Sequence, residues 1–304
     1  MITIKQTVFT GSACAIITPF GADGNVDYRM LKKQVNYQIE NGTDAIVVCG
    51  TTGESAVLST REHRQVIKSV VKYVEKRVPV IAGTGSNSTE TAARRSYTAE
   101  SVGADALLVV TPYYNKCSQS GLIEHYEFIT QQTDLPLIVY NVPSRTGVDI
   151  KPETYRELCK IKNIVATKEA NGNISALTKT LSLCGDELDI YCGNDDQTAA
   201  FMAMGAKGVI SVLANIMPKE MHKLAKLCSE GKIKESVERQ IELLNVANTM
   251  FCDVNPIPVK YAMSVMGLDS GVYRLPLSDT SEINKKHIRD ALKEHNLIDP
   301  SNRT

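Results

Sequence analysis

Lys168 ends an apolar, strand-like run in the stretch NIVATKEANGN, at residues 163–173. Burial of a bare ammonium costs several kcal/mol or lowers the pKa of the amine, so a lysine at this place needs an explanation. A desolvated, neutral amine could attack a carbonyl and form a Schiff base. Alternatively, Lys168 pairs with Glu169 or another carboxylate in a structural ion pair. Spacing alone leaves both roles open.

Tyr140, Thr51 and Thr52 lie at the ends of two other strand-like runs. Tyr140 ends LPLIVY, where a phenol beside an imine could relay protons, or could simply donate to a carbonyl in the core. Thr51 and Thr52 lie in GTTGES, at residues 50–55, and their hydroxyls could pass protons to Tyr140, bind a carboxylate or cap the following helix. This segment lacks the Lys-Ser/Thr ending of a P-loop, so it is weak evidence for a phosphate site.

Arg145 lies in NVPSRTG, between Pro143 and Gly147. A guanidinium on such a stiff loop suits bidentate recognition of a carboxylate, although a surface ion pair would explain it equally well. Two adjacent tyrosines, Tyr113 and Tyr114, end a fourth run in TPYYN. Two aromatic side chains that follow each other at a strand end cannot both point into one core.

Eight short runs rich in β-branched residues alternate with helix-like segments, and they recur roughly every 28 residues, which fits one strand and one helix per unit. This pattern predicts an α/β fold of the (β/α)8 TIM barrel type. A doubly wound sheet is the competing fold, but GADGNVDYR after the first run lacks its GxGxxG turn. The predicted strands are residues 13–20, 44–50, 78–84, 105–112, 135–143, 163–170, 188–194 and 208–215.

Two of the intervening segments carry clear signals of a helix start. Residues 59–77 begin with Ser59 and have Glu62 three positions later, which is a capping-box pattern. Residues 27–42 begin at Asp27 and stop at a glycine. Both segments are therefore predicted to be helices.

The alternation of strands and helices stops after the eighth unit. Three further helices are predicted at residues 232–251, 258–267 and 281–296, and we expect them to pack on the barrel because no Ser/Gly-rich linker separates them. The predicted organisation is a barrel over residues 1–232 and a C-terminal helical appendage over residues 233–304.

In a TIM barrel the active site lies at the C-terminal ends of the strands. The polar segments described above all follow predicted strands, so their side chains should meet at one mouth of the barrel. By strand alternation, Ile164, Ala166 and Lys168 share one face. We therefore expect Lys168 to face the barrel interior and Glu169 to face away.

Composition argues against several classes of function. Lys+Arg and Asp+Glu both number 34, so nothing indicates nucleic acid or an anionic membrane as a partner. The apolar runs are far shorter than the roughly 18 residues of a membrane span, and the N-terminus lacks the apolar stretch of a signal peptide. We therefore expect a cytoplasmic protein. The 8 cysteines form no CxxC pair and have no histidine at metal-ligand spacing, which favours neither a zinc site nor a disulfide framework.

Together, GTTGES, TPYYN, YNVPSRTG and TKEANGN resemble, in order and spacing, the dihydrodipicolinate synthase family of pyruvate-dependent class I aldolases, which also contains N-acetylneuraminate lyase. The resemblance covers essentially the whole chain. It implies condensation of pyruvate with L-aspartate 4-semialdehyde to 4-hydroxy-tetrahydrodipicolinate, the first committed step toward diaminopimelate and lysine, with no metal or other cofactor. The alternatives are another pyruvate-dependent aldolase or lyase, such as a neuraminate lyase, and a non-catalytic barrel that binds a keto acid.

The resemblance also implies catalytic roles. Lys168 would form the Schiff base with pyruvate, and Thr52, Tyr140 and Tyr114 would form a proton relay. Tyr114 would reach in from a neighbouring subunit, so the resemblance implies self-association, as a homotetramer built from two tight dimers.

Four further residues match substrate-binding positions of the family. Thr51 would hold the pyruvate carboxylate beside the relay, and Arg145 would bind the carboxylate of aspartate semialdehyde. Gly193 and Ile210, at the ends of the seventh and eighth strands, would contribute backbone groups.

Lysine-inhibited members of the family bind lysine near a subunit interface, and the matching residues here are Ser55, Ala56, His63, Asn87 and Tyr113. However, Thr60 and Thr91 stand where such members carry a histidine and a glutamate. Loss of the carboxylate that pairs the lysine ammonium should weaken binding, unless the adjacent Glu90 substitutes for it. We expect weak or absent feedback inhibition.

Overall fold

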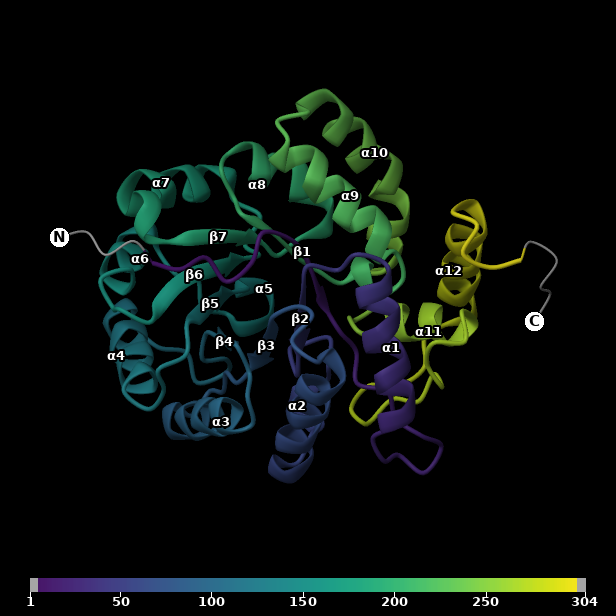
Figure 1. Cartoon of the computed structure of the whole chain (residues 1–304), viewed down its shortest axis with the longest axis horizontal. Helices are drawn as coiled ribbons and strands as arrows, with labels where there is room; N and C mark the ends of the chain where they lie inside the picture. Colours follow the sequence, from purple (N-terminus) through teal and green to yellow (C-terminus); the bar gives the residue numbers. More distant parts are fainter. Residues whose placement is uncertain (1–4, 300–304) are drawn as a thin grey trace.

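The computed structural model describes residues 5–299. Eight parallel strands pair in chain order and close into a barrel, which confirms the predicted TIM barrel (Figure 1). The strands are β1 (Gly11–Ala15), β2 (Ala45–Val48), β3 (Val80–Gly83), β4 (Ala106–Val110), β5 (Leu137–Asn141), β6 (Ile164–Glu169), β7 (Asp189–Cys192) and β8 (Gly208–Ser211).

Helices between the strands surround the barrel and bury its outer face (Figure 1). They are α1 (Tyr28–Glu40), α2 (Thr60–Val74), α3 (Thr89–Ser101), α4 (Gln119–Thr130), α6 (Pro152–Leu158), α7 (Ile174–Cys184), α8 (Thr198–Ala203) and α9 (Pro218–Ser229). The predicted capping box is present at α2, where Ser59 N–H donates to Glu62 at 2.9 Å and Glu62 N–H donates to the Ser59 hydroxyl at 3.3 Å. It ends the loop that follows β2 and so helps to fix the segment carrying Thr51 and Thr52.

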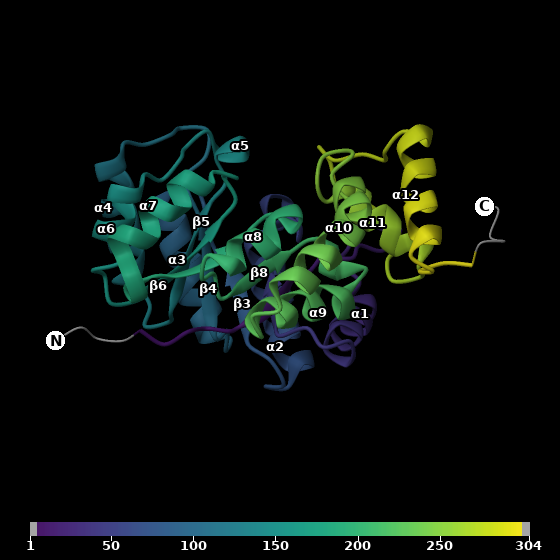
Figure 2. The ribbon, with the colours of Figure 1, turned by 90° about the horizontal axis from the view of Figure 1, so that it is seen from above.

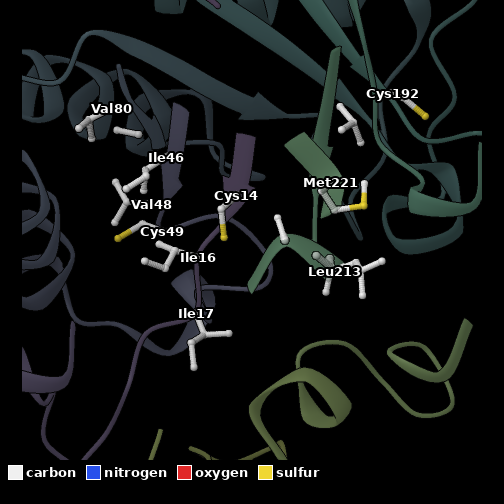
Figure 3. Close-up of a cluster of buried hydrophobic side chains, with 14 of the residues drawn as sticks. Cys14, Ile16, Ile17, Ile46, Val48, Cys49, Val80, Cys192, Leu213 and Met221 are labelled. Atoms are coloured by element: carbon white, nitrogen blue, oxygen red, sulfur yellow. The ribbon is translucent and has the colours of Figure 1, made fainter. Parts of the chain in front are cut away.

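Two hydrophobic clusters lie on the two sides of the barrel wall. The inner cluster fills the barrel and includes Ile81, Ile138 and Tyr191. The larger outer cluster lies between strands and helices, and Figure 3 shows Cys14 and Cys192 among its side chains. Because both faces of every strand are buried, the strands are apolar throughout instead of alternating with polar residues.

The side-chain alternation of β6 is interrupted near its start. The pairing of β5 with β6 passes from Leu137–Ile164 to Ile138–Ala166, which leaves Val165 without a partner in this ladder. Val165 and Ala166 both join the inner cluster, whereas Ile164 joins the outer one. The predicted face of Ile164 was therefore wrong, because this irregularity shifts the phase of the strand by one residue.

The C-terminal part of the chain forms α10 (Ile233–Thr249), α11 (Ile257–Val265) and α12 (Glu282–Glu294). Helices α11 and α12 lie at the end of the molecule opposite α4 and α6 (Figures 1 and 2). A fully buried ion pair joins Lys260 of α11 to Glu54 in the loop after β2, with 2.7 Å between Nζ and Oε1. This pair ties the C-terminal helices to the mouth of the barrel. The division of the chain at residue 232 stays a prediction.

Candidate active site

The C-terminal ends of the strands enclose a cavity of about 210 Å³. Five residues expected to meet at this mouth line it: Lys168, Tyr140, Thr51, Thr52 and Arg145. They come from β6, β5, the loop after β2 and the segment after β5, so side chains from distant parts of the chain converge on one space of small-molecule size.

Lys168 and Tyr140 occupy paired positions on β6 and β5. Lys168 is only 5% exposed, and its Nζ lies 4.4 Å from the centroid of the Tyr140 ring. No ion pair joins Lys168 to a carboxylate within residues 5–299, and Glu169 points to the other side of the strand. The predicted orientation of these two residues is confirmed, and the structural ion pair with Glu169 is not formed.

Glu169 instead sits in a buried polar network behind the strand. Its carboxylate accepts hydrogen bonds from Asn141 Nδ2, from the Tyr155 hydroxyl at 2.9 Å and from Asn171 N–H at 2.9 Å. Burial raises the pKa of Glu169 to about 7, although these hydrogen bonds oppose the rise. The network joins β5, α6 and the loop after β6, and so holds the strand end that carries Lys168.

Thr52 is held from the C-terminal part of the chain. Its buried hydroxyl oxygen accepts a hydrogen bond from Asn255 Nδ2 at 3.1 Å. The loop is anchored on either side, since Thr18 donates to the carbonyl of Gly53 at 2.7 Å and Glu54 pairs with Lys260. The two threonines therefore face the cavity on a loop that is fixed from several directions.

Arg145 lies on α5 (Pro143–Thr146), a single helical turn that ends at Gly147 with φ of 70°. Its Nη2 donates to the carbonyl of Asn255 at 3.4 Å, and it forms no ion pair with any residue in the described range 5–299. The exposed guanidinium lines the cavity, so most of its donors are available to an anion there. The surface ion pair that the sequence left open is not formed.

Gly193 and Ile210 differ in their relation to the cavity. Gly193 lines it, and a Cβ at this position would lie 3.2 Å from Cε of Lys168 and 2.7 Å from Cβ of Ala170. Only glycine leaves room here for the lysine side chain. The side chain of Ile210 is fully buried in the inner cluster and does not line the cavity, whereas Val212 does. The backbone role that the resemblance implies for Ile210 stays a prediction.

Tyr114 does not reach the cavity of its own chain. Its side chain is 92% exposed, and its backbone has φ of 71°, in the left-handed region. A large aromatic side chain that projects so far into solvent beside a site is available to another molecule. The structure thus separates Tyr114 from Tyr140 and Thr52 within one chain.

A second cavity, of about 350 Å³, adjoins the first and shares Thr51, Arg145 and Asn255 with it. Of the five residues that match the family's lysine site, Ser55, Ala56 and Tyr113 line this cavity. His63 is buried instead, with Nε2 2.8 Å from the carbonyl of Gly83, and burial lowers its pKa to about 4. Asn87 is not part of the lining, and the exposed Glu90 is not either.

Sequence reasoning missed four polar or aromatic residues of the first cavity, namely Ser144, Asn194, Phe251 and Asn255. Ser144 and Asn194 directly precede or follow residues that were identified, so proximity was an available signal. Phe251 and Asn255 come from the connection between α10 and α11, which lies beyond the barrel, and no motif in the sequence marks them.

Within residues 5–299, no group of three or more His, Cys, Asp or Glu side chains is placed to hold a metal ion. In the same part of the chain, no helix has both the length and the apolar character needed to cross a membrane.

The profile of the dihydrodipicolinate synthetase family matches residues 8–295. A 4-hydroxy-tetrahydrodipicolinate synthase of Clostridium novyi (strain NT) is 48% identical over 291 residues, which cover 96% of this chain and 98% of the relative.

Solved structures give the same relationship. The chloride-inhibited dihydrodipicolinate synthase of Acinetobacter baumannii, complexed with pyruvate, has a TM-score of 0.93 and 44% identity, over 96% of this chain and 100% of that one. A monomeric variant of a dihydrodipicolinate synthase has a TM-score of 0.93 and 41% identity, over 96% of this chain and 98% of that one.

Proposed function

The chain belongs to the dihydrodipicolinate synthetase family, and we propose that it condenses pyruvate with L-aspartate 4-semialdehyde to give 4-hydroxy-tetrahydrodipicolinate. This reaction is the first committed step of diaminopimelate and lysine biosynthesis. The protein is thus an enzyme of the lyase class that works through a Schiff base.

The observation that carries this proposal is that the Lys168 amine lies 4.4 Å from the Tyr140 ring, in the cavity at the mouth of the barrel. The amine forms no ion pair with a carboxylate in the described chain, and a phenol lies beside it. An amine so placed can add to a ketone, while the phenol can exchange protons with the developing carbinolamine.

The proposed reaction proceeds in four steps. The Lys168 amine adds to the C2 carbonyl of pyruvate, and loss of water gives an imine. A methyl proton then leaves, which converts the imine to an enamine, and the enamine carbon attacks the aldehyde of the second substrate. Tyr140 and Thr52 move the protons at each step, and Thr51 binds the pyruvate carboxylate. Attack by the second substrate's amine on C2 finally releases Lys168 and closes the ring.

Arg145 supports the choice of aspartate semialdehyde as second substrate. The guanidinium faces the cavity without a protein carboxylate to neutralise it, so it suits a substrate carboxylate. Gly193 leaves room for the Lys168 side chain at the cavity, since a Cβ there would lie 3.2 Å from Cε of the lysine. A neuraminate lyase needs the same lysine and tyrosine, but its sugar-acid substrate does not require an arginine on this loop.

Two exposed apolar features support self-association, which we propose takes the form of a homotetramer built from two tight dimers. Tyr114 projects from the loop after β4, where a partner's cavity could accept it. Separately, Ile233, Val237, Ile241 and Leu244 form a stripe along α10, each between 41% and 64% exposed. Two apolar surfaces on different elements fit two kinds of interface.

We place the reaction in the cytoplasm. All 8 cysteines are free thiols in the structure, and Cys252 is exposed. Such thiols persist in a reducing compartment, and in an oxidising one they would be prone to pairing.

A steady-state assay tests the function. The wild type should consume pyruvate together with aspartate semialdehyde and should not cleave N-acetylneuraminate, whereas Lys168→Ala should do neither. Lys160→Ala is the matched control, because Lys160 is an exposed lysine that pairs with Glu157 on the protein surface. Cleavage of the sugar acid would favour the lyase alternative, and binding of pyruvate without turnover of either substrate would favour a keto-acid sensor.

A further inference from the structure

We propose that Asn255 is a positioning residue that sets the direction in which the Thr52 hydroxyl donates its proton. The inference rests on the proposed function, in which Thr52 belongs to the proton relay. Its basis is one hydrogen bond between residues 203 positions apart, with 3.1 Å between Asn255 Nδ2 and Thr52 Oγ1. Both side chains are buried, with 3% of Thr52 and 6% of Asn255 exposed.

The chemistry of the two groups fixes the polarity of this bond. An amide nitrogen can only donate, whereas a hydroxyl has one hydrogen and two acceptor lone pairs. Since Thr52 Oγ1 accepts from Asn255, its single hydrogen is free to point elsewhere, and no other partner of this hydroxyl occurs within residues 5–299. The hydroxyl lines the cavity together with Tyr140 and Lys168, so the proton is presented to the reacting groups.

Asn255 is well suited to this task because its own position is fixed independently of its amide. It lies two residues before the helix α11, whose Lys260 is buried against Glu54 at 2.7 Å and donates to the carbonyl of Val272 at 2.7 Å. Its backbone carbonyl accepts from Arg145. A change confined to the amide therefore leaves the backbone contacts of this residue in place.

The amide makes only one hydrogen bond in the described chain. Asn255 Oδ1 is buried and has no partner within residues 5–299. Replacement of the Nδ2 group by an oxygen of the same size thus alters a single interaction. Asn255→Asp makes this replacement, because an ionised carboxylate can only accept and would draw the Thr52 proton away from the cavity.

We expect Asn255→Asp to lower kcat at neutral pH by on the order of 100-fold, because one general acid–base group typically accelerates a reaction by at least that factor. Its KM for pyruvate should stay near the wild-type value.

As the pH falls, the new carboxyl gains a proton and can donate to Thr52 as the amide did, so the ratio of variant to wild-type kcat should rise. The charged and titratable side chains that share the two cavities with position 255 are Lys168, Tyr140, Arg145, Glu54, Arg95 and Tyr113, so the wild type is measured beside the variant at every pH. Asn248→Asp, which adds the same charge at an exposed position on α10, should behave like the wild type.

A second measurement separates this role from a structural one. In a Thr52→Val background, Asn255→Asp and the uncharged Asn255→Ala should cause no further loss, because the group through which position 255 acts is already gone. If the aspartate variant fails to fold, the alanine variant carries this comparison alone. Multiplicative losses in the Thr52→Val background, or an aspartate variant within twofold of the wild type at neutral pH, would overturn the proposal. A wild type that does not condense the two substrates would instead contradict the proposed function, so the two failures are distinguishable.

Discussion

Tyr140 and Lys168 are register partners on adjacent parallel strands, and the lysine Nζ lies 4.4 Å from the centroid of the tyrosine ring. The spacing of the amine and the phenol is therefore set by backbone pairing within the barrel wall, and not by a loop. Groups carried by rigid strands are held more accurately than groups on loops, which suits a reaction that moves protons between them.

Arg145→Ala should raise the KM for aspartate semialdehyde strongly while leaving imine formation with pyruvate intact. The guanidinium lines the cavity and has no ion-pair partner in the described chain, so its removal costs a substrate contact and little stability. Steady-state kinetics with each substrate varied in turn measure the effect. Arg289→Ala, at an arginine on α12 that contacts Tyr261, is the control. Unchanged kinetics in Arg145→Ala would remove the reason to prefer a synthase over a lyase.

Lysine should inhibit the enzyme weakly or not at all. Ser55, Ala56 and Tyr113 line the second cavity, but Glu90 does not. Thr91 stands at the position where lysine-inhibited members of the family carry a glutamate. Initial rates at increasing lysine concentration measure this directly, and Thr91→Glu should increase the sensitivity. Inhibition of the wild type at micromolar lysine would contradict the prediction.

Glu169→Gln should change how stability depends on pH. The pKa of Glu169 is about 7 in the folded protein, above its ordinary value of 4.5, so the folded state binds this proton more tightly than the unfolded state. The resulting stabilisation is complete below about pH 4.5 and is lost as the pH rises through 7. Since one pKa unit corresponds to 1.36 kcal/mol, the free energy of unfolding should fall by about 3 kcal/mol over this range.

Urea unfolding of both proteins at pH 5 and pH 8 checks this difference. The wild type should lose stability relative to the glutamine variant over that interval, since glutamine does not titrate. Parallel changes in the two proteins would show that Glu169 ionises as an ordinary carboxyl.

Ile241→Asp should reduce the mass of the assembly in solution. Ile241 is the most exposed member of the apolar stripe on α10, and a carboxylate there would have to be desolvated in an interface. Sedimentation velocity should detect the dissociation, with Lys234→Asp as a charge control at an exposed position of the same helix. An unchanged sedimentation coefficient would exclude this stripe as an interface.

The sequence was sufficient to predict the barrel and most of the site because both depend on local patterns. Strand periodicity located the polar residues at strand ends, and alternation correctly set Lys168 inward and Glu169 outward. The same rule failed at Ile164, since an irregular strand register shifts the phase and leaves no mark in the sequence.

Contacts between distant segments were beyond sequence reasoning. Asn255 contacts Thr52 from the segment before α11, and the buried Lys260–Glu54 pair, a contact across 206 positions, joins that helix to the loop after β2. For Ile210, the resemblance implied a backbone contribution to the site; its side chain packs into the inner cluster, and the backbone role stays a prediction. The relay role of Tyr114 depends on a second chain and stays a prediction.

Trapping of the imine tests the central claim most directly. Pyruvate and borohydride should together add the mass of one reduced pyruvate adduct to the protein, and peptide mapping should place it on Lys168. Lys160→Ala should be labelled like the wild type, and Lys168→Ala should not be labelled. A wild-type protein that gains no adduct, or one that carries it on another lysine, would contradict the account.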